Sequence, residues 1–393
     1  MNAAAYLDHA ASTPLRAAAR QAYVDALETF GDPLRIHRDG RTARRILDDA
    51  RASLAEAVAA QPDEIVLTSG GTESIALAIW GAVRPIRDRG DRILVGDIEH
   101  PAVFGVAQAL EADGVRTVRV PVDEFGRVDI DAFGMELRAP GTLLASVQHA
   151  NHEVGTVQPI AEAARMCRQA GVLFHTDACQ TGGRLPIDVG ALGVDLLSLS
   201  AHKFGGPSGA GVLYVRRGVA VAAYPCGDER ERKRRSGMEN VPAAAAMAAA
   251  LASARAAMAD EAARQWALTE ALRRGIAERV PRARLHGHPT QRVPHIACFS
   301  IGGLDAETLM MALDDRGVRV GGGSPCSGAP GEPSSVLDAM GVPGTPAFPI
   351  GVGDATTDED VAELLDVLPE LASELQAVEA ASSEALTAFR SPH

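Results

Sequence analysis

The 393-residue sequence lacks the cysteine patterns of a metal site or a disulfide framework, and its first residues show no pattern of a secretory signal. Its five cysteines, at positions 167, 179, 226, 298 and 326, are widely spaced and include no CxxC pair. No basic-then-apolar segment precedes Asp8, so the N-terminus does not look like a secretory signal. We therefore expect a cytoplasmic protein in a reducing compartment, with no metal ligands.

The chain also lacks an excess of basic residues and a long hydrophobic run. Lys and Arg total 38 against 51 Asp and Glu, a net charge of −13, which argues against nucleic-acid binding. The blandest stretch, Ala243–Ala259, is mostly alanine, contains Arg255 and is too short to span a bilayer comfortably. It predicts a helix of a soluble protein. The apolar share of 46% supports a sizeable core and excludes a disordered chain.

Short apolar runs alternate with amphipathic ones over the first 215 residues. Strands are predicted at Glu64–Thr68, Arg92–Gly96, Val115–Val120, Thr142–Val147, Val172–Asp177, Asp195–Ser200 and Gly211–Val215. Helices are predicted between them, at Thr72–Ala82, Pro101–Ala112 and Ile160–Ala170. This alternation is typical of an α/β domain with a mainly parallel seven-stranded sheet, covered by helices on both faces.

The pattern changes after residue 241. A long helical stretch to about Val280 is followed by a strand at His295–Ile301, a helix at Ala306–Asp315 and a last helix from Asp358 to about Leu375. We predict four parts: an N-terminal segment (1–14) that packs with the small domain, a large α/β domain (15–255), a small α+β domain (256–378) and a flexible tail (379–393).

Lys203 is the first candidate for chemistry. It follows a predicted strand and precedes a glycine-rich stretch, which places it at the carboxyl edge of the sheet, where open α/β sheets bind ligands. Partial burial there lowers the pKa of a lysine and exposes a nucleophilic amine, so Lys203 is a candidate Schiff-base former. The alternative is an ordinary surface lysine.

Three further signals lie at successive strand ends. Asp177 ends a strand and suits the protonated nitrogen of a pyridine ring, or the N-cap of a helix. Thr68–Ser74 runs through glycines into a helix, as a phosphate cradle or an ordinary turn does. His100 follows the next strand and could lie over a flat ring or be a buried core histidine.

In this order, the motifs resemble the cysteine desulfurases of the iron–sulfur and nitrogenase sulfur-donor group. These belong to the class V aminotransferase family, which depends on pyridoxal 5′-phosphate (PLP) and has PLP fold type I. The resemblance covers nearly the whole chain, through Tyr6–Pro14, Thr68–Ser74, Glu99-His100, His175–Gln180, Ser198–Lys203, Arg235–Gly237 and Ser324–Leu337. It implies a homodimer that converts L-cysteine to L-alanine and passes the sulfur to an acceptor protein.

The resemblance also implies residue roles. Lys203 would bind PLP as a Schiff base and assist catalysis, and Asp177 would pair with the ring nitrogen. Gln180 would bond the phenolic oxygen of the ring, and His100 would stack on its face and act in catalysis. The phosphate would be held by Gly71, Thr72, Ser200 and His202.

Cys326 narrows the expected reaction to a desulfurase. Free cysteines are most often buried, but this one lies in a glycine-rich stretch with few apolar side chains, which predicts an exposed thiol. The resemblance implies that Cys326 is catalytic and accepts the sulfur as a persulfide. The other four cysteines are predicted to be structural.

Four positions depart from the family pattern. Pro349 stands where an arginine usually clamps the substrate carboxylate, and His152 replaces an asparagine near the ring. Met238 replaces a threonine that reaches the partner's phosphate, and Asp32 replaces an asparagine. We predict that Arg35 or His152 takes over the carboxylate, that His152 also touches the cofactor, and that Asn151 adds a substrate contact.

Other functions remain open. A PLP-dependent C–S or selenocysteine lyase would release its product directly and need not depend on Cys326. A non-catalytic dimeric scaffold for sulfur transfer is motivated by the missing arginine. The basic cluster Arg230–Arg235 could bind an anion near the partner's site or be a solvated loop.

Overall fold

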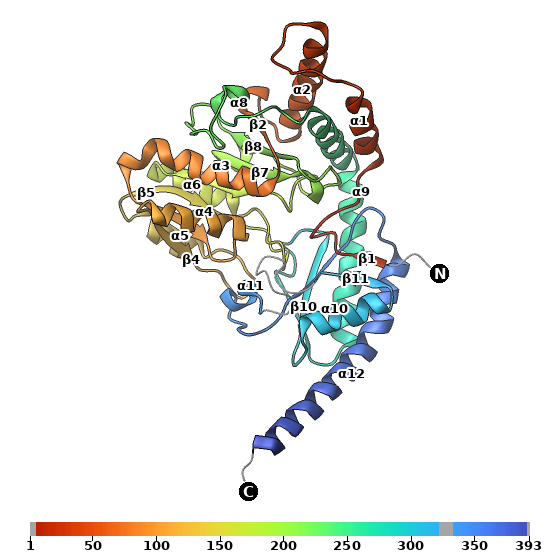
Figure 1. The fold of residues 1–393 in the computed structure, drawn as a ribbon. Helices are drawn as coiled ribbons and strands as arrows, with labels where there is room; N and C mark the ends of the chain where they lie inside the picture. The colour runs from red at the N-terminus through yellow and green to blue at the C-terminus, as the bar shows by residue number, and fades with distance from the viewer. Residues whose placement is uncertain (1–4, 322–332, 391–393) are drawn as a thin grey trace.

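A computed structural model describes residues 5–321 and 333–390, with side chains as far as residue 378. Its largest element is a seven-stranded sheet in the order β2-β8-β7-β6-β5-β3-β4 (Figure 1). Only β8 runs antiparallel to its neighbours in this sheet. The predicted mainly parallel sheet is therefore confirmed. Its strands are β2 (Ile65–Thr68), β3 (Arg92–Gly96), β4 (Arg116–Val120), β5 (Thr142–Ser146), β6 (Leu173–Asp177), β7 (Leu196–Ser200) and β8 (Gly211–Val215).

Helices cover both faces of this sheet. Successive side chains of a strand point to opposite faces, so in β3 Leu94 belongs to one apolar cluster while Ile93 and Val95 belong to another. Burial on both faces explains why these strands read as unbroken apolar runs. The helices of this domain are α1 (Ala17–Leu27), α2 (Arg38–Ala57), α3 (Gly71–Val83), α4 (Pro101–Ala112), α5 (Ile130–Leu137), α6 (Ile160–Ala170), α7 (Val189–Leu192) and α8 (Arg230–Lys233).

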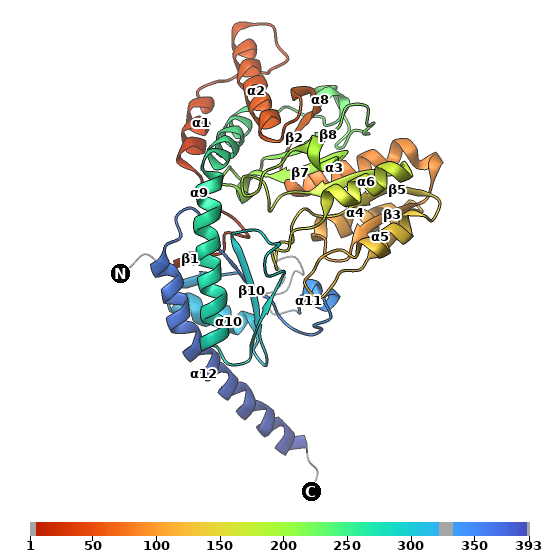
Figure 2. The same ribbon diagram turned by 180° about the vertical axis from the view of Figure 1, so that it is seen from behind.

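The helix α9 (Val241–Arg279) joins the large domain to a smaller one (Figure 2). Leu251 near its start packs in the large-domain core, whereas Leu272 packs in the core of the small domain. The predicted boundary at residues 255 and 256 falls inside this helix. The small domain contains β9 (Ala283–His286), β10 (Ile296–Ile301), β12 (Phe348–Gly351), α10 (Ala306–Asp315), α11 (Ser335–Ala339) and α12 (Asp358–Arg390).

In the described residues, α9 is the one helix long and apolar enough to cross a membrane. Half of its most apolar window is buried inside the protein. It packs against α1, α2 and α12 and against the strands β9 and β10. Its apolar character therefore reflects a position in the core, where alanine permits close helix packing.

The N-terminal segment connects the two domains at the functional edge of the sheet. Strand β1 (Ala5–Leu7) pairs in parallel with β11 (Val318–Val320) of the small domain. The chain then crosses to the large domain, where the backbone N–H and the hydroxyl of Thr13 both donate to the carbonyl of His202, at 2.9 Å each. The segment therefore lies directly against the loop that carries Lys203.

The C-terminal helix α12 differs from the prediction. It continues to Arg390, where the sequence analysis expects an end near Leu375 and a flexible tail at 379–393. Alanine is frequent beyond Leu375, and this strong helix former favours continuation of the helix. Residues 391–393 lie outside the described part of the chain.

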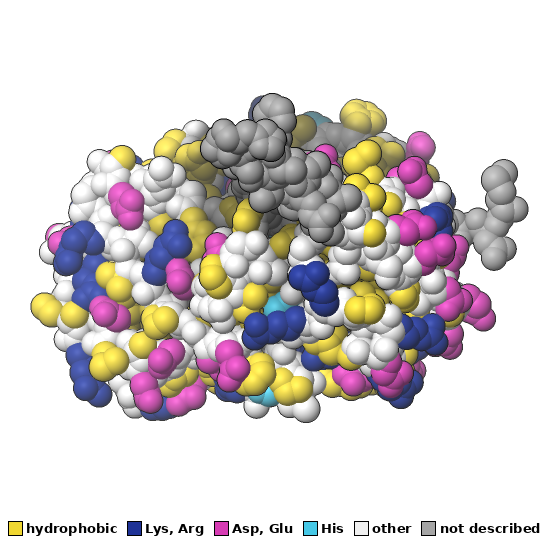
Figure 3. All heavy atoms as spheres, turned by 90° about the horizontal axis from the view of Figure 1, so that it is seen from below, with side chains coloured by type: hydrophobic (Ala, Val, Ile, Leu, Met, Phe, Trp, Pro, Cys, Tyr) yellow, Lys and Arg dark blue, Asp and Glu magenta, His cyan; other side chains and the backbone are white. Residues whose placement is uncertain are grey.

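Acidic and basic side chains are interspersed on the face shown in Figure 3.

Candidate active site

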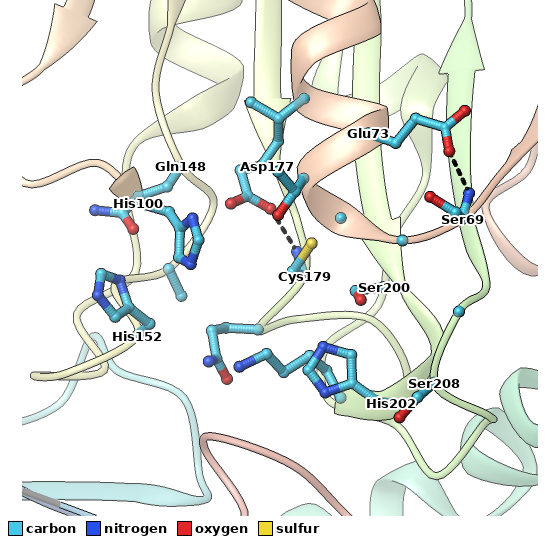
Figure 4. A pocket seen from close by; sticks show the side chains of 18 residues that line it. Ser69, Glu73, His100, Gln148, His152, Asp177, Cys179, Ser200, His202 and Ser208 are labelled. Carbon is cyan, nitrogen blue, oxygen red and sulfur yellow. Dashed lines mark hydrogen bonds between the residues drawn. The ribbon is translucent and has the colours of Figure 1, made fainter. Parts of the chain in front are cut away.

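Loops at the carboxyl ends of β2, β3, β5, β6 and β7 enclose a cavity of about 330 Å³ (Figure 4). Parallel strands bring their carboxyl ends to one edge, which is where such sheets bind ligands. The cavity contains nine of the predicted cofactor and catalytic residues: Gly71, Thr72, His100, His152, Asp177, Gln180, Ser200, His202 and Lys203. Cys326 lies outside the described residues.

Lys203 is held by the N-terminal segment. It ends the short 3₁₀ helix Ala201–Lys203 after β7, and its Nζ donates to the carbonyl of Ala10 at 2.7 Å. The side-chain amide of Gln180 donates to the same carbonyl at 2.9 Å. One backbone oxygen thus sets the position of both side chains in the cavity.

Asp177 shapes the turn that follows β6 and also faces the cavity. One carboxylate oxygen accepts a hydrogen bond from the backbone N–H of Cys179 at 3.0 Å. Asp177 is buried, and none of the ion pairs among the described residues includes it. Its negative charge is therefore available to a cationic group bound in the cavity.

A glycine pair begins α3 at the edge of the cavity. A Cβ at Gly71 would lie 2.8 Å from Cys179 Sγ and 3.2 Å from Ser200 Cβ, so only glycine fits without displacing a neighbour. The first N–H groups of a helix have no intrahelical acceptor and attract anions. Glu73 secures this turn, because it accepts from the Ser69 N–H at 2.8 Å and pairs with Arg235 at 2.9 Å.

Two histidines lie together on one side of the cavity (Figure 4). The Nδ1 of His100 accepts from the Ala102 N–H and caps α4, and the His100 ring meets the His152 ring edge-on, with centroids 5.5 Å apart. Burial lowers the pKa of His100, and it lowers the pKa of His152 to about 3. Both His152 ring nitrogens are buried without a hydrogen-bond partner among the described residues, a cost that a bound ligand can offset.

His202 lies on the opposite side of the cavity in Figure 4, and its pKa is lowered to about 4 by burial and by Lys203. It is therefore neutral at pH 7 and can donate or accept one hydrogen bond at each ring nitrogen.

A second cavity of about 270 Å³ adjoins the first and shares His100, His152 and Lys203 with it. Pro349 of β12 forms part of its wall, and the described lining residues include no arginine. Its remaining charged side chains are the carboxyl groups of Asp8 and Glu153, and burial raises the pKa of Asp8. Among the described lining residues, Lys203 and the two histidines are the side chains that can donate to a substrate carboxylate.

Two of the three predicted substrate contacts do not line either cavity. Arg35 lies between α1 and α2, 69% exposed, and its nearest charged partner is Asp32 at 3.6 Å. Asn151 is buried, and its side chain bonds the Ile98 carbonyl and the N–H groups of Glu153 and Val154. Within one chain, Asn151 thus fixes the turn that aims His152, and Arg35 remains on the surface.

The structure adds wall residues that the sequence analysis did not select. Cys179 lines the first cavity beside Gly71, although it was expected to be structural, and Gln148 lines it after β5. Gln148 bonds the buried pair Ile98 and Glu99, and burial raises the pKa of Glu99 well above its usual range. The position of Cys179 between Asp177 and Gln180, two predicted cofactor residues, could have indicated from the sequence that it lies near the cavity.

Comparison with known proteins places these features in context. Residues 5–364 match the family model "Aminotransferase class-V". The chain is 40% identical, over 95% of both chains, to the cysteine desulfurase IscS of Dictyoglomus turgidum. A solved NifS-like protein superposes with a TM-score of 0.88 at 30% identity, covering 95% of this chain and 100% of that one. A structure of SspA in complex with cysteine has a TM-score of 0.76 at 27% identity, covering 88% and 98%.

The buried histidines around the site predict a loss of stability in acid. His175 lies in β6, between the hydroxyls of Ser146 and Ser198, and burial lowers its pKa from 6.5 to about 4. The unfolded chain therefore binds the proton first as the pH falls. We expect the contribution of His175 to the free energy of unfolding to be present in full above pH 6.5 and to be lost as the pH falls from 6.5 to 4.

Urea unfolding across this range measures the effect. His175→Gln should reduce the slope by up to about 1.4 kcal/mol per pH unit, the value for one proton. His37→Gln is the control, because the His37 side chain is 58% exposed. Equal slopes for wild type and His175→Gln would contradict the prediction.

Proposed function

The chain belongs to the class V aminotransferase family, as a cysteine desulfurase, and from this we propose that it moves the sulfur of L-cysteine to Cys326 for delivery to an acceptor protein. The observation that carries the proposal is the cavity in which Lys203, Asp177 and the α3 glycine turn converge. The substrate C–S bond breaks, the Cys326 thiol becomes a persulfide, and the remaining carbon skeleton takes a proton to become L-alanine.

The cavity suits PLP in shape and in chemistry. A lysine amine, a buried carboxylate without an ion-pair partner and an anion cradle match the aldehyde, the ring nitrogen and the phosphate of this cofactor. The His152 nitrogens are buried without a hydrogen bond among the described residues, with Nε2 3.7 Å from a Glu153 carboxylate oxygen, so they can bond a polar group in the cavity. When bound, PLP supplies an electron sink for the carbanion formed at the substrate α-carbon.

We assign the following actions to the residues of the cavity. Lys203 holds the cofactor and takes the α-proton of the substrate on its Nζ, which the Ala10 carbonyl keeps in place. Asp177 holds the ring-nitrogen proton, and Gln180 bonds the phenolic oxygen. His100 covers the ring face, and its Nδ1 is occupied by the Ala102 N–H, which leaves Nε2 as the protonated nitrogen.

The phosphate of the cofactor is assigned to the N-terminus of α3. Gly71 and Thr72 contribute backbone N–H groups, and Ser200 and His202 contribute side chains from the loop on the other side of the cavity. Because these groups come from β2 and β7, their geometry depends on the pairing of both strands with β8.

His152 is our candidate for the substrate carboxylate. It lines both the cofactor cavity and the adjoining cavity, so it stands where the amino-acid backbone would lie beside Lys203. Its low pKa makes it a neutral donor, which binds a carboxylate more weakly than the arginine that Pro349 replaces. Arg35 could serve the same role only from another chain or after the α1–α2 connection moves.

The functional unit is proposed to be a homodimer. The connection between α1 and α2 projects from the large domain in Figure 1 and exposes three large apolar side chains, those of Phe30, Leu34 and Ile36. Phe30 is 76% exposed and Ile36 is 90% exposed, which is costly for a surface that faces only water. A second copy of the chain is the partner that we assign to it, in the cytoplasm and without a membrane or nucleic acid.

One prediction tests the proposed phosphate site at the N-terminus of α3. Gly71→Ala should weaken PLP binding at least about tenfold, because the new Cβ forces Cys179 and Ser200 away from the phosphate position. Titration of the apoprotein with PLP, followed by absorbance, measures this. Adding Cys179→Ala to the same chain removes the closest clash and should restore part of the affinity. Unchanged binding in Gly71→Ala would place the phosphate elsewhere.

The second prediction tests the sulfur acceptor. The PLP-loaded wild type should release alanine and, with a reductant, sulfide from L-cysteine, and Cys326→Ser should lose both. Cys226→Ser is the matched control, because that thiol is exposed and outside both cavities. Activity that survives Cys326→Ser favours a C–S lyase, and no activity in the wild type favours a scaffold.

The third prediction tests the carboxylate contact. His152→Ala should raise KM for L-cysteine about tenfold, the loss expected for one hydrogen bond to a charged group, with a smaller change in kcat. His152→Asn keeps a hydrogen-bond donor, so its KM should lie between those of the wild type and His152→Ala. Arg35→Ala, assayed in parallel, tests the other candidate. If neither alanine variant changes KM, both assignments are wrong.

A further inference from the structure

A third cavity, of about 180 Å³, shares no lining residue with the two cavities of the active site. It lies where three parts of the chain meet: the N-terminal segment at His9–Arg16, the loop just after Lys203, and the turn after β12. Its lining residues are His9, Thr13, Pro14, Leu15, Arg16, Arg184, Phe204, Gly205, Asp354 and Ala355.

Arg184 is the unusual residue of this cavity. Its side chain is buried, with the residue only 6% exposed, and among the described residues no carboxylate lies within ion-pair distance of it. Its one hydrogen bond there runs from Nη1 to the neutral amide of Gln265, at 3.0 Å. Burial lowers its pKa to about 10. A buried guanidinium has five donors and is normally paired, so Arg184 has unused capacity for an anion.

The other charges in the cavity do not satisfy Arg184. Arg16 is engaged with Asp354, at 2.5 Å, and donates through Nε to the Phe204 carbonyl at 3.0 Å. Burial lowers the pKa of His9 to about 4, so His9 is neutral at pH 7, and its Nδ1 is buried without a hydrogen-bond partner in the described chain. Two guanidinium groups and one carboxylate leave one unbalanced positive charge in the cavity.

We propose that this cavity binds a small monocarboxylate, whose two oxygens accept hydrogen bonds from the guanidinium of Arg184. The planar fork of an arginine matches a carboxylate in a bidentate pair. A single negative charge balances the cavity, whereas a dianion such as sulfate would also meet the carboxylate of Asp354. The volume admits an anion of a few carbon atoms and excludes a nucleotide.

The bound carboxylate acts on the catalytic loop through its neighbours. Phe204 and Gly205 directly follow Lys203, and the Arg16 N–H donates to the Gly205 carbonyl at 2.9 Å. Asp354 follows β12, the strand that places Pro349 in the wall of the second cavity. An anion on Arg184 therefore holds the N-terminal segment, the Lys203 loop and the small domain together, as a positioning ligand that touches no reacting atom.

Thermal unfolding of the PLP-loaded enzyme tests the proposal, with sodium acetate compared with chloride and sulfate at equal ionic strength. Acetate should raise the Tm of the wild type saturably, whereas sulfate should produce only the non-saturating increase that an excluded salt gives to any folded protein. Arg184→Gln should lose this response and bind acetate at least tenfold more weakly by calorimetry. In chloride, its Tm should equal or exceed that of the wild type, because an unpaired buried charge has been removed.

Two further variants separate the alternatives. Asp354→Asn removes the repelling carboxylate, so acetate should bind more tightly and sulfate should add a saturable rise in Tm to its general salt effect. Arg217→Gln is the control, since Arg217 forms an exposed pair with Asp63, and it should respond as the wild type does. An acetate response that survives in Arg184→Gln but disappears in His152→Asn would place the anion in the second cavity and overturn the proposal.

Discussion

The carbonyl of Ala10 is the contact on which the geometry of the site depends. It accepts hydrogen bonds from Lys203 Nζ and from the Gln180 amide, so one oxygen sets the two side chains that approach the same cavity from different loops. Ala10 itself is positioned by the small domain, because β1 pairs with β11 and the His9 N–H donates to the Gly351 carbonyl. The position of Lys203 is therefore coupled to the strands β11 and β12 of the small domain, which lie more than a hundred residues further along the chain.

The cavity is built to be completed by a ligand. Burial keeps His152 and His202 neutral, leaves both His152 nitrogens without partners, and encloses the Asp177 carboxylate without an ion pair among the described residues. Each of these features costs stability, since polar groups removed from water need partners. The cofactor proposed above has an aldehyde, a ring nitrogen and a phosphate, which would supply partners for these groups. Hydrogen bonds formed in this way would contribute to the free energy of cofactor binding.

The residues assigned to the cofactor match the family pattern in this chain, whereas those expected to bind the substrate depart from it. The residues assigned to the cofactor all line one cavity, whereas the position expected to carry the carboxylate arginine holds Pro349. The second cavity contains the carboxyl groups of Asp8 and Glu153, and we assign the substrate carboxylate to His152. Arg184 lines a separate cavity and carries a buried positive charge. The proposed cofactor site and the proposed anion site therefore share no lining residue.

The sequence alone determined the sheet and its functional edge. The seven strands were predictable because strands buried on both faces read as apolar runs, and the Lys203, Asp177 and Gly71 motifs were predictable because they follow strand ends. Tertiary structure decided what periodicity does not encode. Cys179 and Gln148 line the cavity wall, whereas the Asn151 side chain is engaged in hydrogen bonds to the backbone. Arg35 lies on the surface, and α12 extends to Arg390. Whether a polar side chain faces a cavity, a backbone group or water depends on neighbours distant in sequence, and only the folded chain brings them together.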